Sequence, residues 1–216
     1  MHGRTLTILL SVGLILGSIS LLRLLGDVHL PGNDQGYSPR QPIAYSHRLH
    51  AGDLEIPCLY CHSGAEKSRH AGIPAANVCM NCHKFVTAAL DDVREEAQRA
   101  NAEGRQPRPV VSAELRKLYD ALGLGADLKP DPARTPRPIE WIRVHRVPDF
   151  VYFDHRPHVA AGVDCRRCHG AVETMEQVFQ VESLSMGWCV QCHRHESDDG
   201  TQERVVASTD CAACHY

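Results

Sequence analysis

The chain has 216 residues and a formal charge of −3 at neutral pH, from 23 basic and 26 acidic side chains. This balance, with no basic stripe along the chain, gives no reason to expect nucleic-acid binding. Four Phe, two Trp and six Tyr are too few for a large aromatic core, whereas ten cysteines are many for this length.

Residues 1–25 predict a transmembrane anchor. Leu6 to Leu25 is apolar apart from small residues and Arg23, and as a helix it would be about 30 Å long, enough for a bilayer core. A cleaved signal peptide is the alternative, but Ser18-Ile19-Ser20 is a poor cleavage site. Arg4 before the span favours a single pass with the N-terminus inside. The rest of the chain is then expected on the periplasmic side of a bacterial cytoplasmic membrane.

Residues 26–41, rich in Gly, Pro, Asn, Asp and Ser, are expected to form an extended linker. Beyond it, all ten cysteines fall in five C-x-x-C-H motifs. The cysteines are Cys58, Cys61, Cys79, Cys82, Cys165, Cys168, Cys189, Cys192, Cys211 and Cys214. C-x-x-C-H is the attachment signal of c-type haem, in which both thiols form thioethers and the histidine becomes the proximal iron ligand.

Paired cysteines also allow a Cys₄ zinc site or thiol redox chemistry. Neither alternative requires a histidine after every second cysteine, so the motifs predict five covalently bound haem c groups. The proximal iron ligands are then His62, His83, His169, His193 and His215. With about two ionised propionates on each haem, the loaded protein should be distinctly acidic.

A longer pattern repeats around these motifs. From Ile43 and again from Val151, an aromatic residue, one further residue and His-Arg-x-His precede a C-x-x-C-H motif. We interpret the repeat as a di-haem module at 42–84 and a tri-haem module at 141–216. The expected fold is mostly α and irregular, with a transmembrane helix followed by a haem-cored multihaem cytochrome c domain of little regular secondary structure.

Residues 85–140 form a helical and proline-rich insert between the modules. The segment from Phe85 has helical composition, and the segment from Ser112 has a Ser N-cap and ends at Gly123. The insert either covers haems, faces a partner or is a solvated surface.

The distal ligand of each iron separates electron transfer from catalysis. Two histidine pairs are spaced i,i+3, so that each pair shares a helix face and its members cap two different haems. These pairs are His47 with His50 and His155 with His158. The candidates for the fifth iron are His145, Met186 and His70. A methionine ligand would raise the potential of that haem.

The phrases HAGIPAANVCMNCH, WIRVHRVPDFVYFDHRPHV and SMGWCVQCHR, with the anchor and five motifs, resemble the pentahaem ActA-type cytochrome c subunit of alternative complex III. The aromatic-x-His-x-x-His pattern is similar to class III multihaem cytochromes. The resemblance covers nearly the whole chain and is least specific between 85 and 138. It implies a membrane complex that oxidises quinol and reduces a periplasmic carrier or terminal oxidase. The implied partners are an iron–sulfur subunit, polytopic quinol-binding subunits and a monohaem cytochrome.

Because a ligand is available for every iron, the sequence favours an electron-transfer subunit without substrate chemistry of its own. A multihaem nitrite or hydroxylamine reductase would need an open iron, and no variant motif marks one. A small quinol dehydrogenase that binds quinol beside its own anchor is the other alternative, although one short span offers few polar groups for a quinone pocket.

Overall fold

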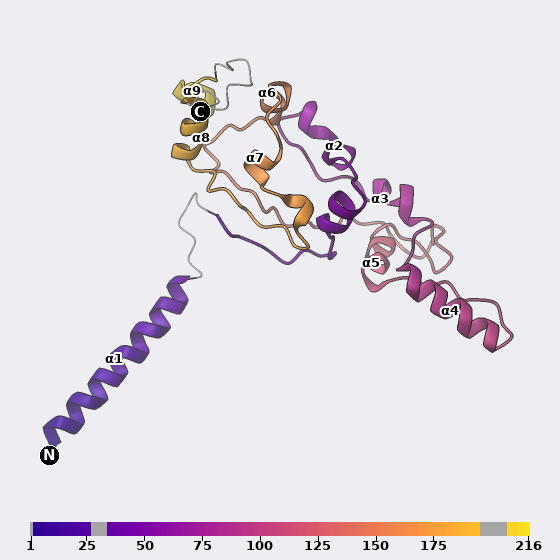
Figure 1. The fold of residues 1–216 in the computed structure, drawn as a ribbon, viewed down its shortest axis with the longest axis horizontal. Coiled ribbons are helices and arrows are strands. Elements are labelled where there is room, and N and C mark those ends of the chain that lie inside the picture. Colours follow the sequence, from indigo (N-terminus) through magenta and orange to yellow (C-terminus); the bar gives the residue numbers. More distant parts are fainter. Residues whose placement is uncertain (1, 27–33, 195–206) are drawn as a thin grey trace.

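The computed structural model describes residues 2–26, 34–194 and 207–216, which form short helices joined by long irregular segments (Figure 1). Within these residues no strand is present, and two isolated β-bridges join Leu124 to Pro130 and Val151 to His215. The α-helices are α1 (His2–Gly26), α2 (Cys58–Cys61), α3 (Ala76–His83), α4 (Leu90–Ala102), α5 (Ala113–Ala121), α6 (His155–Ala160), α7 (Arg166–His169), α8 (Met186–Arg194) and α9 (Cys211–Cys214). A π-helical turn η1 (Arg48–Asp53) and the 3₁₀ turns η2 (Ser63–Glu66) and η3 (Val172–Thr174) complete them. The expectation of a mostly α and irregular fold is confirmed.

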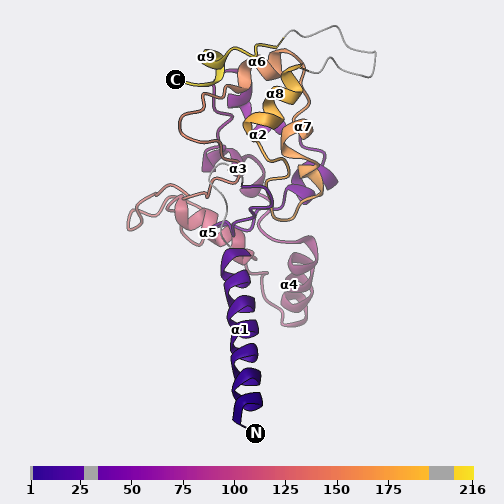
Figure 2. The ribbon, with the colours of Figure 1, turned by 90° about the vertical axis from the view of Figure 1, so that its left-hand side faces the viewer.

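Helix α1 extends away from the rest of the chain (Figures 1 and 2). Its segment Gly3–Leu21 has a mean hydropathy of 1.7, and none of it is buried. Leu14, for example, is 74% exposed. At about 1.5 Å per residue this segment is roughly 28 Å long. By length and composition the helix can cross a membrane, although a signal sequence meets the same criteria.

The second half of the expected linker is bound to the body. Residues 27–33 lie outside the described part of the chain, but residues 34–41 run beside residues 177–181. The Gly36 N–H donates to the Gln180 carbonyl at 2.7 Å, and the Gln180 N–H donates to the Tyr37 carbonyl at 3.0 Å. Residues 34–41 are therefore part of the body rather than a free tether.

The insert contributes to the largest apolar cluster, where α5 meets α3. Ile43, Leu118 and Tyr119 are buried in this cluster. The Tyr119 hydroxyl donates to the His83 carbonyl at 2.6 Å. Helix α5 therefore covers the second attachment motif, so at least this part of the insert is not a solvated surface.

Helix α5 begins and ends as the sequence predicts, whereas α4 begins at Leu90, later than the helical composition from Phe85 indicated. The Ser112 side chain caps α5 by accepting from the Leu115 N–H, and Gly123 follows the helix with φ +69°. Helix α4 projects further from the body (Figure 1). It is held by Glu96, which is 9% exposed and accepts from Arg105 at 2.5 Å.

Candidate functional site

Each C-x-x-C-H motif is formed on one of five short helices, α2, α3, α7, α8 and α9. Residues three apart share a helix face, so one turn brings both thiols of a motif to the same side. The histidine N–H can close this turn on the first cysteine carbonyl, as His62 does onto Cys58 at 2.9 Å and His169 onto Cys165 at 3.0 Å. No disulfide joins any of the ten cysteines, which leaves every one available for a thioether.

Four motif histidines face a second imidazole. The ring centroids are 6.5 Å apart for His47 and His62, 6.4 Å for His155 and His169, 6.0 Å for His50 and His83, and 6.0 Å for His158 and His193. A metal–imidazole bond is about 2 Å long, so two imidazoles on opposite sides of one metal have centroids roughly 6 Å apart. Each of the four pairs thus has the spacing of two axial ligands of one iron, and each i,i+3 pair is divided between two motifs.

Hydrogen bonds orient most of these rings. Nδ1 of three motif histidines lies 2.6 to 2.8 Å from a backbone carbonyl, that of Gly72 for His62, Val86 for His83 and Ser208 for His193. On the facing side, Nδ1 lies 2.8 Å from the carbonyl of Ser46 for His50, Arg69 for His155 and Asp154 for His158. A carbonyl can only accept, so Nδ1 carries the proton and the Nε2 lone pair is left for a metal.

An aromatic ring packs on each i,i+3 pair. Tyr45 lies 4.8 Å from His47 at 83° and 4.4 Å from His50 at 23°. Phe153 lies 4.8 Å from both His155 and His158, at 84° and 32°. The two copies of the sequence repeat therefore share the same packing of one aromatic ring on two imidazoles.

Burial keeps buried imidazoles of these pairs in the neutral form. Burial, reinforced by the neighbouring His62 and His50, lowers the pKa of His47 to about 4. Burial, together with nearby histidines, lowers the pKa of His169 to about 3. Both imidazoles are then neutral at pH 7, the form that binds iron. Burial also raises the pKa of the Cys168 thiol to about 11.

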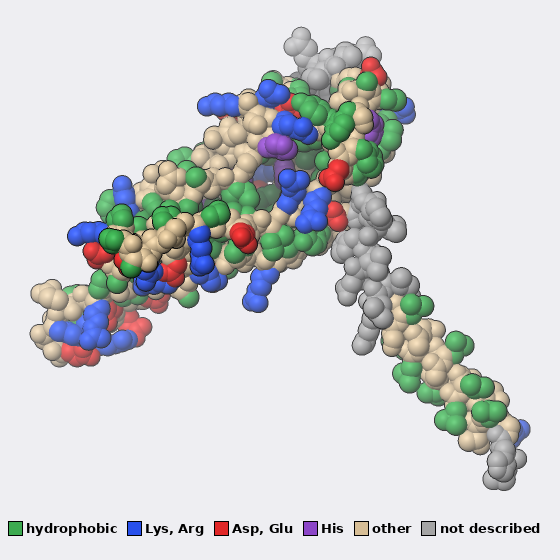
Figure 3. Space-filling model, turned by 180° about the vertical axis from the view of Figure 1, so that it is seen from behind, with side chains coloured by type: hydrophobic (Ala, Val, Ile, Leu, Met, Phe, Trp, Pro, Cys, Tyr) green, Lys and Arg blue, Asp and Glu red, His purple; other side chains and the backbone are tan. Residues whose placement is uncertain are grey.

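The surface of the body is hollowed on one face. Figure 3 shows a hollow in its rear face, with a histidine at the rim among Lys and Arg side chains. In the described residues no three His, Cys, Asp or Glu side chains converge on one point. Facing imidazoles beside paired free thiols fit haem c in chemistry and in spacing.

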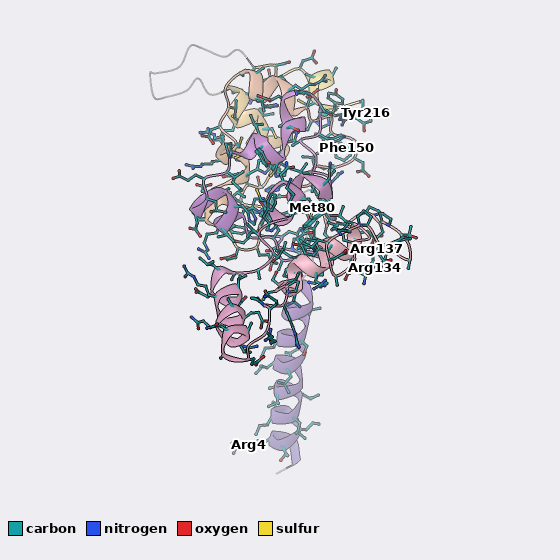
Figure 4. The ribbon with its side chains drawn as sticks, turned by 90° about the vertical axis from the view of Figure 1, so that its right-hand side faces the viewer. Arg4, Met80, Arg134, Arg137, Phe150 and Tyr216 are labelled. Atoms are coloured by element: carbon teal, nitrogen blue, oxygen red, sulfur yellow. The ribbon has the colours of Figure 1, made fainter. Side chains whose placement is uncertain are left out.

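The fifth motif differs from the other four. No ring contact in the described residues joins His215 to another histidine; Phe150 packs against it, with centroids 5.8 Å apart and planes at 24°. Phe150 and Tyr216 lie at one edge of the body (Figure 4), where the Tyr216 hydroxyl donates to the Asp149 carbonyl at 2.6 Å. A phenyl ring has no ligand atom, so the second ligand of this position comes from elsewhere.

The three candidates for that ligand lie in different surroundings. His145 packs edge-on against His169 at 4.3 Å, its Nε2 is buried without a partner, and burial lowers its pKa to about 4. Met186 begins α8 and is 65% exposed. His70 is exposed on the loop after η2.

Sequence reasoning missed two residues of the site. Phe150 directly precedes the β-bridge between Val151 and His215, a long-range pairing that local pattern does not reveal. Arg69, whose carbonyl holds His155, stands alone in a loop and has no motif around it.

Comparison with known proteins agrees with this geometry. Residues 151–216 match the family model described as cytochrome c7 and related cytochrome c. These residues, with their facing imidazoles and free thiols, define a multihaem c-type cytochrome domain whose cofactor is covalently bound haem c. Over 195 residues, 81% of this chain and 76% of the relative, the sequence is 24% identical to the protein named menaquinone reductase, multiheme cytochrome c subunit, of Nitratidesulfovibrio vulgaris (strain Hildenborough).

Proposed function

We propose that the protein is a membrane-anchored pentahaem cytochrome c that transfers electrons within a quinol-oxidising respiratory or photosynthetic complex. The four facing imidazole pairs carry this proposal, because an iron with two strong axial ligands has no position for a substrate. When bound, haem c supplies one-electron chemistry by cycling between ferric and ferrous iron. The chain's own role is to hold, orient and bury the ligands.

The ligand assignment follows the ring pairs. His62, His83, His169 and His193 bind on the proximal side, and His47, His50, His155 and His158 on the distal side. Six of these ligands have a carbonyl that accepts from Nδ1, which fixes the ring orientation and raises the basicity of the ligand. Nδ1 of His47 is buried and has no partner, so its ring lacks this support.

For the fifth iron, bound by His215, we assign Met186. Helices α8 and α9 lie side by side in both views (Figures 1 and 2), and burial and the neighbouring Cys214 raise the pKa of Cys189. Met186 is three residues before Cys189 and shares its helix face. His145, by contrast, packs on His169 of the third motif. Near-infrared magnetic circular dichroism should show one haem with imidazole and thioether ligands. Met186→Ala should remove the signal of that haem. An unchanged spectrum would mean that His145 or His70 is the second ligand of the fifth iron.

Helix α1 is assigned as the anchor. Its apolar surface is exposed and long enough for a bilayer. Arg4 lies near the end of the helix remote from the body (Figure 4), which supports an N-in orientation with the haem domain in the periplasm. Extraction of the mature chain should require detergent, and its N-terminus should lie at or near Met1.

We further assign partners by resemblance to the alternative complex III subunit: an iron–sulfur subunit, polytopic quinol-binding subunits and a monohaem cytochrome. Electrons would enter from the quinol-oxidising side and leave to a periplasmic acceptor. The name of the N. vulgaris relative supports a second candidate, in which electrons flow toward menaquinone. The native complex should be purified and assayed for quinol oxidation and for menaquinone reduction; the faster reaction identifies the direction.

The number of haems is the most direct test. Mass spectrometry of the denatured chain should show five haem additions, because thioethers survive denaturation. A mass equal to that of the polypeptide alone, or of the polypeptide with zinc, contradicts the proposal. Carbon monoxide binding to the intact protein would show an open iron and favour a reductase. Quinol oxidation by the isolated subunit would favour a small quinol dehydrogenase.

A further inference from the structure

Arg69 lies at the junction of the two modules, and no carboxylate in the described residues forms an ion pair with it. It lies in the loop between η2 and α3, and its Nε is buried without a hydrogen-bond partner. No ion pair in the described residues joins it to a carboxylate, whereas Arg48, Arg105 and Arg156 each have one. A buried charged nitrogen without a partner is costly, so such groups are normally paired.

The position of Arg69 is well defined. Its guanidinium lies over the Tyr152 ring, with Cζ 4.3 Å from the ring centroid. Its carbonyl accepts from the backbone N–H of His155 at 3.2 Å and lies 2.8 Å from Nδ1 of the same residue. The loop cannot move away easily, because Gly64 packs so closely beneath it that a Cβ there would approach the Ala71 carbonyl to 2.5 Å. The Arg69 carbonyl is thus held next to the His155 ring that faces His169, and the guanidinium of the same residue is held over Tyr152.

We propose that Arg69 binds a carboxylate, a propionate of the haem held between His155 and His169. This inference rests on the proposed function, since haem loading brings carboxylates into the body. Guanidinium binds carboxylate by two parallel N–H···O bonds, and Nε is one of the donors of that fork. Stacking on Tyr152 keeps the plane of the guanidinium fixed, which lowers the cost of ordering it.

The pairing has an electrical consequence for the iron. A propionate that is paired with a cation places less negative charge near the iron, and negative charge favours the ferric state. Arg69 therefore raises the potential of the third haem, while its carbonyl, through His155, acts in the opposite direction. One residue thereby adjusts one haem through two different groups.

The test uses the haem-loaded full-length chain in detergent, with redox titration of all five haems. In Arg69→Gln, one of the five one-electron steps should move to lower potential while the other four remain. Arg69→Lys keeps the charge and should retain most of the wild-type potential. Arg99→Gln is the matched control, because Arg99 is an exposed arginine on α4 that is already paired with Glu95 at 2.6 Å. It should leave all five steps in place.

Resonance Raman spectra give a second readout that does not depend on Arg69→Gln folding. The propionate bending bands of one haem should shift in Arg69→Lys, because the donor geometry changes. Unchanged bands together with unchanged potentials overturn the inference. A potential shift seen only in the native complex also overturns it, since the carboxylate would then belong to a partner. A chain that carries no haem by mass contradicts the proposed function instead.

Discussion

The two repeated segments build the same arrangement of rings but support it differently. The angles between the Tyr45 ring and its two histidine rings, 83° and 23°, are close to those between Phe153 and its two histidine rings, 84° and 32°. Yet Nδ1 of His155 is held by the Arg69 carbonyl, while Nδ1 of His47 is buried and unpaired. A carbonyl of the first module therefore accepts a hydrogen bond from His155 of the second module. No carbonyl accepts one from Nδ1 of His47, the matching residue of the first module. Identical pattern in the sequence does not guarantee identical ligand strength.

The largest effect is expected when His47 or His155 is replaced, and the two variants test the difference between the modules. His47→Ala and His155→Ala should each convert one low-spin haem to high spin, because one iron loses its second imidazole. Both proteins should keep five thioether-bound haems. His155→Ala should also be less stable than His47→Ala by about 1 kcal/mol, since it alone breaks a hydrogen bond between modules.

Electron paramagnetic resonance, carbon monoxide titration and chemical denaturation measure these outcomes. Lys129→Ala, an exposed side chain in the insert, serves as the control. Equal stability of the two histidine variants would remove the difference between the modules, and unchanged spin states would remove the ligand assignment.

The contact between η1 and η3 is the next test. Gly52 in η1 packs against Glu173 of η3, and a Cβ there would overlap the Glu173 carbonyl. The matching position of the second module is Ala160, so only the first module requires glycine. Gly52→Ala should lower the free energy of unfolding by about 1–3 kcal/mol through overpacking. Denaturant melts should show this loss, while Gly13→Ala in α1, which has open space around it and lies far from the body, should not.

A smaller effect concerns potential. A carbonyl that accepts from Nδ1–H makes the imidazole a stronger donor and favours ferric iron. In the described residues, His62 and His155 have this support, whereas His47 and His169 do not. By ligand strength alone, the haem between His47 and His62 and the haem between His155 and His169 should therefore have similar potentials. Redox titration of Arg69→Gln, which removes the opposing charge but keeps the carbonyl, gives the cleanest comparison. A large difference between these two potentials in that variant would show that Nδ1 support does not control them.

The smallest expected effect is a dependence of stability on pH that is confined to the insert. Hydrogen bonding to Arg105 and to the Arg108 N–H lowers the pKa of Glu96 to about 2, below its ordinary 4.5. The folded state therefore holds the carboxylate more strongly than the unfolded chain, and this stabilisation is present above pH 4.5 and lost as pH falls toward 2. The protection factors of the amides in α4, which correct for the pH dependence of intrinsic exchange, should fall over that range while haem spectra of both modules stay constant. In Glu96→Gln these protection factors should no longer depend on pH there.

Local chemistry was readable from the sequence, whereas the pairing of distant parts was not. The five motifs, the Ser112 cap and the end of α5 at Gly123 each depend on neighbouring residues, and local pattern reveals them. That His47 faces His62 while His50 faces His83 depends on how a whole module folds. The role of the Arg69 carbonyl was invisible because any residue offers the same backbone group. The same reason hid the binding of residues 34–41 to the body.

The pairing of residues 34–41 with the segment around Gln180 constrains the order in which parts of the body can form during synthesis. Gly36 pairs with Gln180, so a segment made early waits for one made 144 residues later. Contacts of such long sequence separation form late, because the loop between them must first be ordered. The body therefore closes only after most of the chain has emerged. The attachment motifs at Cys58 and Cys79 are therefore synthesised well before residues 34–41 can take their final place.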